Sequence, residues 1–170
     1  IHLIDFEGGP YGVIEYGVAS LHRGAVVCCH TRLCRASDQI PDRDTWQHGL
    51  RRQDTEAFPP MSEDWALFNG LRQTGLFAAH HASVENRFLK DTWPYPSEAP
   101  DFSHPGTKLA EWGPWLDTRT IYEQLYPGLD SYKLGDLIKT LGLQQMLDTL
   151  AGQHCPDGRR RYHCALYDAL

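Results

Sequence analysis

Apolar and polar positions alternate along the first fifth of the chain in the way that is typical of strands. Residues 1–9, IHLIDFEGG, form an apolar run, and residues 11–34 contain two further β-rich runs separated by His22, Arg23 and Gly24. A break of this length and composition suits a hairpin turn. The pattern therefore predicts three antiparallel strands joined as a meander.

Helical spacing first appears after a polar stretch. Residues 35–60 are polar with Pro and Gly at both ends, which predicts a long loop with one short helix. In residues 62–75, SEDWALFNGLRQTG, three bulky apolar side chains recur at helical spacing, and Ser62 is a candidate N-cap. We expect an amphipathic helix here that ends near Gly75.

Short strands then alternate with helices. The predicted pairs are a strand in LFAAHH followed by a helix in ASVENRFLK, and a strand in WLDT followed by a helix that stops before Pro127. A helix with an apolar stripe is expected in residues 131–143, and a last helix near Tyr162. This order predicts one α/β domain over residues 1–170, with a mixed five-stranded sheet flanked by helices. Residues 91–114, rich in Pro and Trp, predict an ordered but irregular excursion.

Composition narrows the class of protein. The 170 residues are 41% hydrophobic, enough for a sizeable core, and no apolar stretch approaches the length of a membrane span, so we expect no membrane partner. A net charge of −6 argues against broad binding along a duplex, but a narrow nucleic-acid site can use bound cations to meet phosphates. The chain starts on a strand and stops in a predicted helix, so we expect a domain that can be fused to, or associate with, others.

Cysteine usage indicates the compartment. The five cysteines are an odd number and two of them, Cys28 and Cys29, are adjacent, which fits a reducing, cytoplasmic location better than a disulfide framework. The runs CCHTRLC and HCPDGRRRYHC also suggest zinc half-sites, although neither has the paired ligand spacing of a strong zinc motif. A zinc-organised interaction domain is therefore one alternative.

Two carboxylates, Asp5 and Glu7, share one face of the first strand, because alternate residues of a strand point the same way. Two neighbouring carboxylates raise each other's pKa and destabilise the fold, unless a cation lies between them or they face solvent at the end of the strand. Taken alone, such a pair is more often simply the acidic end of a strand. Further along, Glu85 lies in the first turns of a predicted helix, and His163 and Asp168 lie five residues apart at the end of the chain.

These segments together resemble the DEDDh 3′→5′ exonucleases of the ribonuclease-H-like superfamily, the group of polymerase proofreading subunits, ribonuclease T and the three-prime repair exonucleases. IDFEGG, AHHASVENRFL and HCALYDA resemble the three family motifs, and QHGL and WLDT resemble two secondary segments. Glu85 stands where the family usually has Asp, and His81 replaces the commoner Asn. The resemblance spans essentially the whole chain and implies a ribonuclease-H-like sheet whose first three strands are antiparallel.

The resemblance also implies an activity: metal-dependent 3′→5′ removal of nucleoside 5′-monophosphates from single-stranded DNA or RNA. It implies two divalent cations, Mg²⁺ or Mn²⁺, bound by Asp5, Glu7, Glu85 and Asp168, with His163 as the general base. The implied substrate contacts are Phe6, Gly8, Gly9, His48, Leu50 and His80. Because Glu85 is one methylene longer than the usual Asp, a catalytically weak or inactive nucleic-acid-binding adaptor is the alternative function.

Three details follow from helix geometry and side-chain chemistry. Five helical residues turn through about 500°, so His163 reaches the same site as Asp168 only if it precedes or begins the helix. The arginines at 159–161 predict a flexible approach that meets phosphates or, equally, a solvated charge run. Leu50 is interpreted either as an apolar wedge between the last two bases or as a core residue.

Overall fold

The protein is built on a five-stranded sheet, as seen in a computed structural model that describes residues 1–170. The strands are β1 (His2–Gly9), β2 (Gly12–His22), β3 (Ala25–Leu33), β4 (Phe77–Ala79) and β7 (Trp115–Asp117). Their order across the sheet is β3-β2-β1-β4-β7. The first three strands are antiparallel, and β4 and β7 run parallel to β1. The predicted mixed sheet is confirmed.

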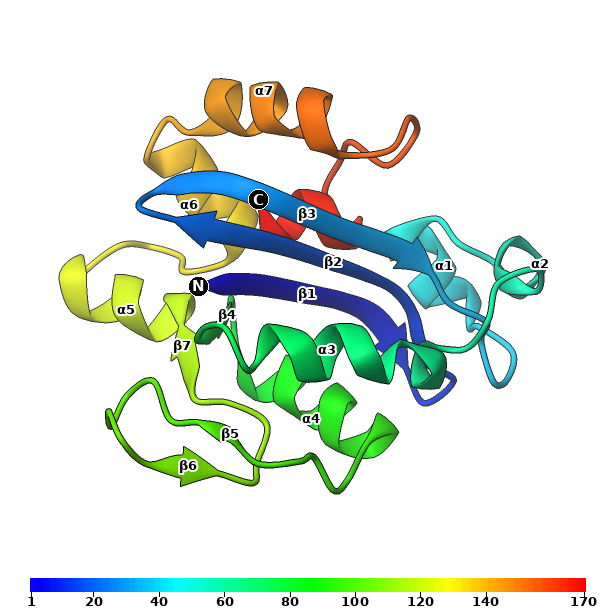
Figure 1. The fold of residues 1–170 in the computed structure, drawn as a ribbon. Helices are drawn as coiled ribbons and strands as arrows, with labels where there is room; N and C mark the ends of the chain where they lie inside the picture. Colours follow the sequence, from blue (N-terminus) through cyan, green and yellow to red (C-terminus); the bar gives the residue numbers. More distant parts are fainter.

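Helices cover both faces of this sheet. They are α1 (Asp42–His48), α2 (Arg52–Thr55), the 3₁₀ turn η1 (Met61–Asp64), α3 (Trp65–Leu71), α4 (Ser83–Thr92), α5 (Thr118–Leu125), α6 (Leu134–Thr140), α7 (Gln144–His154) and α8 (Ala165–Ala169). In Figure 1, α3 and α4 lie on one side of the sheet, whereas α6 and α7 lie on the other. No helix here has both the length and the apolar character that a membrane crossing requires.

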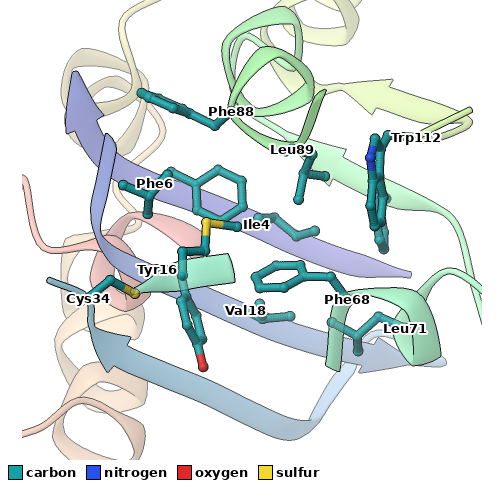
Figure 2. Close-up of a cluster of buried hydrophobic side chains, with 13 residues drawn as sticks. Ile4, Phe6, Tyr16, Val18, Cys34, Phe68, Leu71, Phe88, Leu89 and Trp112 are labelled. Carbon is teal, nitrogen blue, oxygen red and sulfur yellow. The ribbon is translucent and has the colours of Figure 1, made fainter. Parts of the chain in front are cut away.

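The core on the first face is made by alternate residues of two paired strands. Ile4 and Phe6 of β1, with Tyr16 and Val18 of β2, point toward α3 and α4 (Figure 2). The Phe68 ring of α3 is fully buried, and its centroid lies 5.7 Å from that of Phe6 and 5.3 Å from that of Tyr16. Burial of each such side chain contributes roughly 1.5–3 kcal/mol. This cluster fixes β1 in the middle of the sheet.

On the opposite face, α8 packs directly on β2 at Gly17. A Cβ atom at Gly17 would lie 2.2 Å from the backbone nitrogen of Leu166, so a residue with a side chain would push α8 away. Leu166 also packs in a second core cluster with Leu147 and Ala151 of α7. This close contact holds α8, and with it Asp168, against the first two strands.

Tryptophan packing joins residues 91–114 to the core. Trp112 is only 3% exposed, and its indole nitrogen donates a hydrogen bond of 2.8 Å to the carbonyl of Trp93. The buried Arg72 guanidinium lies 5.0 Å from the Trp112 ring centroid and donates to the carbonyls of Ser97 and Glu111. A two-stranded sheet of β5 (Ala99–Pro100) and β6 (Lys108–Leu109) lies within the segment.

Helix α3 is shorter than predicted. Its first turn is preceded by a 3₁₀ turn that begins at Met61 directly after Pro60, and Ser62 therefore lies inside that turn and is not an N-cap. The α-helix ends at Leu71, before Gly75. Pro60 (φ −65°) has no backbone N–H that would need a partner, so a helical turn can begin directly after it, which fits the earlier start.

Two further differences lie near the end of the chain. Helix α7 was not predicted, because its buried apolar face consists only of Leu147 and Ala151. Helix α8 begins at Ala165, three residues after Tyr162. The delay follows from His163, whose φ of 60° lies in the left-handed region that a right-handed helix excludes.

Candidate active site

The first part of the site is the acidic face of β1. Asp5 and Glu7 alternate with the core residues and so face the side that α8 covers. Glu7 lies directly opposite Glu15 in the β1–β2 ladder, and the register then shifts between Glu7 and Gly8. A Cβ atom at Gly8 would lie 2.6 Å from the Gly12 carbonyl oxygen, so the bulge requires glycine. Three acids, Asp5, Glu7 and Glu15, therefore share one face of the sheet.

The second part is the segment that enters α8. The backbone N–H of His163 donates a hydrogen bond of 2.9 Å to Oδ2 of Asp168, which ties the two residues together across the start of the helix. His163 precedes the helix, so the five-residue spacing does not separate the two side chains. Potential ligand atoms of Glu7, His163 and Asp168 all lie within 4.8 Å of one another.

Three carboxylate oxygens at this site are buried without a hydrogen-bond partner. They are Oδ2 of Asp5, Oε2 of Glu85 and Oδ1 of Asp168. Only two other buried side-chain polar atoms in the protein lack a partner, and both belong to arginines. An unpaired buried carboxylate oxygen is costly, and such atoms are uncommon in native proteins. The charges of Asp168 and Glu85 both act on Asp5, so these oxygens indicate a site for a positively charged ligand.

The carboxyl groups have raised pKa values. Burial, together with the charges of Asp168 and Glu15, raises the pKa of Glu7 to about 8. Burial also raises the pKa of Asp168 to about 7, and burial followed by the charge of Asp168 raises the pKa of Asp5 well above its usual range. Near neutral pH the cluster therefore keeps protons unless positive charge enters it.

Glu85 joins the cluster from α4. Its side chain is only 4% exposed, and burial, with the charge of Asp117 in addition, raises its pKa to about 7. Asp117, at the end of β7, accepts hydrogen bonds from the backbone N–H groups of His81 (3.1 Å) and Ala82 (3.0 Å). The aspartate of WLDT thus holds the chain just before α4 and fixes where Glu85 enters the site.

Glu15 is a residue of the site that sequence reasoning missed. It is 2% exposed and forms a two-point ion pair with Arg159, in which Nε lies 3.0 Å from Oε1 and Nη2 donates to Oε2. Oε2 also accepts a hydrogen bond of 3.1 Å from the backbone N–H of Ala165. Glu15 therefore anchors both ends of the segment that carries His163. The available signal was an acid inside the apolar run VIEYGVA.

The arginine run is anchored, so the interpretation that all three arginines are free to meet phosphates is wrong. Besides its ion pair, Arg159 donates to the His48 carbonyl at 2.8 Å, and Arg161 donates to the same oxygen at 3.2 Å. Arg160 pairs with Asp157 at 2.9 Å. Arg159 and Arg161 thus bind partners far away in the sequence, whereas the partner of Arg160 is local. These contacts also join the His163 segment to the end of α1.

The His163 ring has one hydrogen-bond partner in the protein. The side-chain amide nitrogen of Gln47, on α1, lies 3.3 Å from Nδ1, and Nε2 has no partner. Partial burial and the nearby charge of Arg161 lower the pKa of the imidazole. The ring is therefore neutral near pH 7, the state in which a histidine can accept a proton.

Of the side chains predicted to contact substrate, three lie inside the protein. Phe6 is 6% exposed in the core of Figure 2. His48 is 2% exposed, and its Nδ1 accepts a hydrogen bond of 3.1 Å from the backbone N–H of Leu50. Leu50 is 6% exposed and packs with Tyr11 and Ile14. This is the position of a core residue, the second of the two interpretations of Leu50.

The remaining predicted contacts lie at the rim of the acidic patch. Gly8 and Gly9 form the end of β1, immediately after Glu7. His80 follows β4, with Nε2 placed 2.8 Å from the Tyr132 carbonyl and Nδ1 placed 3.1 Å from the Thr118 hydroxyl. Its side chain lines a cavity that Asp5 and Asp168 also line. Substrate contact by these residues stays a prediction.

The cysteine and histidine runs form no comparable cluster. Cys28 Sγ lies 3.3 Å from His30 Nε2, but Glu7, His163 and Asp168 are the only group of three potential metal ligands that the structure brings together. All five cysteines are free thiols. The structure therefore brings together no set of cysteine and histidine ligands that would support a zinc-organised interaction domain.

Comparisons with solved structures place the fold. The structure of Exonuclease X in complex with 5′ overhanging duplex DNA matches with a TM-score of 0.65 and 21% identity, over 98% of this chain and 84% of that one. The nuclease domain of 3′hExo, a DEDDh family member, bound to rAMP, matches with a TM-score of 0.66 and 18% identity, over 99% and 84% of the two chains. A full-length 3′-exonuclease matches with the same TM-score and identity, over 99% of this chain but 56% of its own.

Sequence comparison adds no closer relative, because no family model and no curated protein matches this chain. At 18–21% identity, the structural likeness establishes the fold. The chain has the ribonuclease-H-like fold of the DEDDh 3′-exonucleases, and the resemblance in the sequence is confirmed at that level.

Proposed function

We propose that this protein is a metal-dependent 3′→5′ exonuclease that releases nucleoside 5′-monophosphates from single-stranded nucleic acid. The observation that carries the proposal is the set of three buried, unpartnered carboxylate oxygens beside His163, on the fold of the DEDDh exonucleases. A binding module with no chemistry to perform has no need for this costly arrangement.

The donor set fits divalent metal ions. Asp5, Glu7, Glu85 and Asp168 would hold Mg²⁺ or Mn²⁺, which prefer the hard oxygen ligands that carboxylates provide. Two bound cations supply a more acidic water and neutralise the charge that develops on phosphate oxygens. The raised pKa values of these carboxyls describe the metal-free protein, and positive charge would lower them. The ions would therefore also relieve the repulsion among the acids.

His163 is the proposed general base. The Gln47 amide lies against Nδ1, and a half-turn of that amide places its oxygen there, so that Nδ1 carries the proton and Nε2 the lone pair. Nε2 then accepts the proton of the attacking water. The ion pair of Glu15 with Arg159 and the hydrogen bond from the His163 backbone to Asp168 hold this ring in place.

A nucleic-acid 3′ end is the proposed substrate because the solved structures of this fold include complexes with overhanging duplex DNA and with rAMP. We keep both DNA and RNA as candidate substrate classes, because one of these ligands is DNA and the other is a ribonucleotide. The five free thiols support a reducing, cytoplasmic compartment for the reaction.

The proposal is tested by timed digestion of matched DNA and RNA oligonucleotides labelled at the 5′ end, with Mg²⁺ or Mn²⁺. We expect a ladder that shortens one nucleotide at a time, and no shortening with EDTA or with a 3′-phosphate block. The Asp5→Asn variant is the control for contaminating nucleases. Binding without shortening would instead support the inactive adaptor, and neither binding nor shortening would reject both functions.

A further inference from the structure

The lysines of this protein divide into two pairs. The chain has four lysines, and two of them form ion pairs: Lys90 with Glu111 (3.9 Å) and Lys108 with Glu98 (3.6 Å). Lys133 and Lys139, at the two ends of α6, are exposed and have no carboxylate within ion-pair distance.

Both unpaired lysines line the same hollow as the proposed catalytic groups. A hollow of about 420 Å³ has Lys133, Leu134, Gly135, Asp136 and Lys139 on the α6 side, and Tyr162, His163 and Asp168 on the other. We call it the lysine groove. One wall therefore carries the general base and a metal ligand, whereas the other carries two free ammonium groups.

The acids of the groove are already engaged. Asp136 accepts a hydrogen bond of 2.7 Å from the Ser131 hydroxyl, and Asp168 accepts the His163 backbone N–H. Neither forms an ion pair with a lysine. An extended polyanion that enters the groove would thus meet two exposed, unpaired ammonium groups immediately beside the site where its scissile phosphate must lie.

We propose that the lysine groove is a binding site for backbone phosphates of the nucleic-acid strand, next to the phosphate that is cleaved, with Lys133 and Lys139 as the phosphate contacts. The inference rests on the proposed exonuclease function and adds where the rest of the strand runs: from His163 and Asp168 across α6. It assigns the phosphate contacts to α6 rather than to the anchored arginines of residues 159–161.

The test uses the salt dependence of strand capture. In the Lys133→Ala/Lys139→Ala double variant, KM for a single-stranded oligonucleotide should rise while kcat stays within about twofold, because the lysines touch phosphates that do not react. Each phosphate contact on a single strand contributes about 0.7 to the slope of log affinity against log salt, so loss of two contacts should lower that slope by about 1.4. Affinity is measured by fluorescence anisotropy of a labelled oligonucleotide in an Asp5→Asn background.

The matched control is Lys90→Ala/Lys108→Ala, which removes the same charge away from the groove and should leave KM and the salt slope unchanged. Lys133→Arg/Lys139→Arg should restore most of the affinity, and melting curves should be alike for all variants, since these side chains are exposed. If the wild type digests oligonucleotides but both double-alanine variants behave alike, the groove assignment is wrong and the exonuclease proposal stands. If the wild type neither binds nor digests them, the proposed function itself fails.

Discussion

The two faces of β1 are buried to a similar extent but are built in opposite ways. On one face, Ile4 (2% exposed) and Phe6 (6% exposed) pack in a cluster of apolar and aromatic side chains. On the other face, Glu7 is 8% exposed and lies beside Asp5. The neighbouring carboxyl groups include oxygens that have no hydrogen-bond partner. The first face contributes stability and the second face costs it. Groups that a fold keeps at such a cost are those on which function depends.

The contrast also shows how a site is supported by the core. Residues 48–50 join the site to a separate apolar cluster: the His48 carbonyl accepts hydrogen bonds from two arginines of the His163 segment, and Leu50 packs with Tyr11 and Ile14 in that cluster. The position of the His163 segment therefore depends on packing around Leu50. Variants on the two faces should separate activity from stability.

The largest effect is expected on the acidic face. Asp5→Asn removes a proposed metal ligand worth several kcal/mol in the transition state, so activity should fall roughly 10³-fold or more. It also removes one of several buried like charges, so Tm of the metal-free protein should stay the same or rise. Digestion rates and thermal melts of one preparation check both. Activity within a few fold of wild type would remove Asp5 from the site.

The next effect concerns the base. His163→Ala should lower kcat by roughly 10² to 10⁴, the usual range for a lost general base, with oligonucleotide binding largely kept. The acidic limb of the pH–rate profile should disappear with the imidazole. A variant that keeps the wild-type acidic limb would show that another group accepts the proton.

In the separate apolar cluster around Tyr11 and Ile14, Leu50→Ala should cost about 2–5 kcal/mol of stability, as truncation of a buried leucine usually does. Rates on single strands and on duplex ends should then change by the same factor. Unchanged Tm combined with a selective loss on duplex ends would instead restore the wedge interpretation of this residue.

The smallest effect is a pH dependence of stability. The folded-state pKa values of Glu7, Glu85 and Asp168, at about 7–8, lie above the ordinary values near 4, so between these limits the folded protein binds more protons than the unfolded chain. The free energy of unfolding of the metal-free protein should therefore fall as the pH rises from about 5 to 8. A loss of about 1 kcal/mol lowers Tm by roughly 2–4 °C in a domain of this size.

Mg²⁺ should recover this loss at pH 8 more than at pH 5, because the ion competes with protons for the same oxygens. Thermal melts at the two pH values, with and without Mg²⁺, measure the difference. A metal-free Tm that is constant or rises over this range would show that the acidic face carries no such cost.

The sequence predicts the apolar face of β1 and the shared face of Asp5 and Glu7 well, because both depend on local periodicity. Alternation defines β1 to β3, and strand geometry alone puts Asp5 beside Glu7. What the sequence could not predict depends on contacts between distant segments. Glu15 and Arg159 are 144 residues apart, so an isolated acid and an exposed arginine run became a buried ion pair only in three dimensions.

The start of α8 and the presence of α7 could not be predicted for a different physical reason. The late start of α8 depends on the left-handed backbone of His163, a residue type that gives no glycine-like signal in the sequence. Helix α7 presents only a small apolar face, and its position depends on packing against α8 and β2 rather than on its own pattern.

The central claim, that the acidic face of β1 is a divalent-cation site, is tested most directly by counting bound Mn²⁺ with electron paramagnetic resonance at pH 8. The wild type should bind up to two ions per chain, and Asp5→Asn should lose at least one of them. The matched control, Glu63→Gln, removes an exposed acid on the opposite side of the sheet and should bind as the wild type does. Equal Mn²⁺ binding by the wild type and Asp5→Asn, or none by either, would contradict the account.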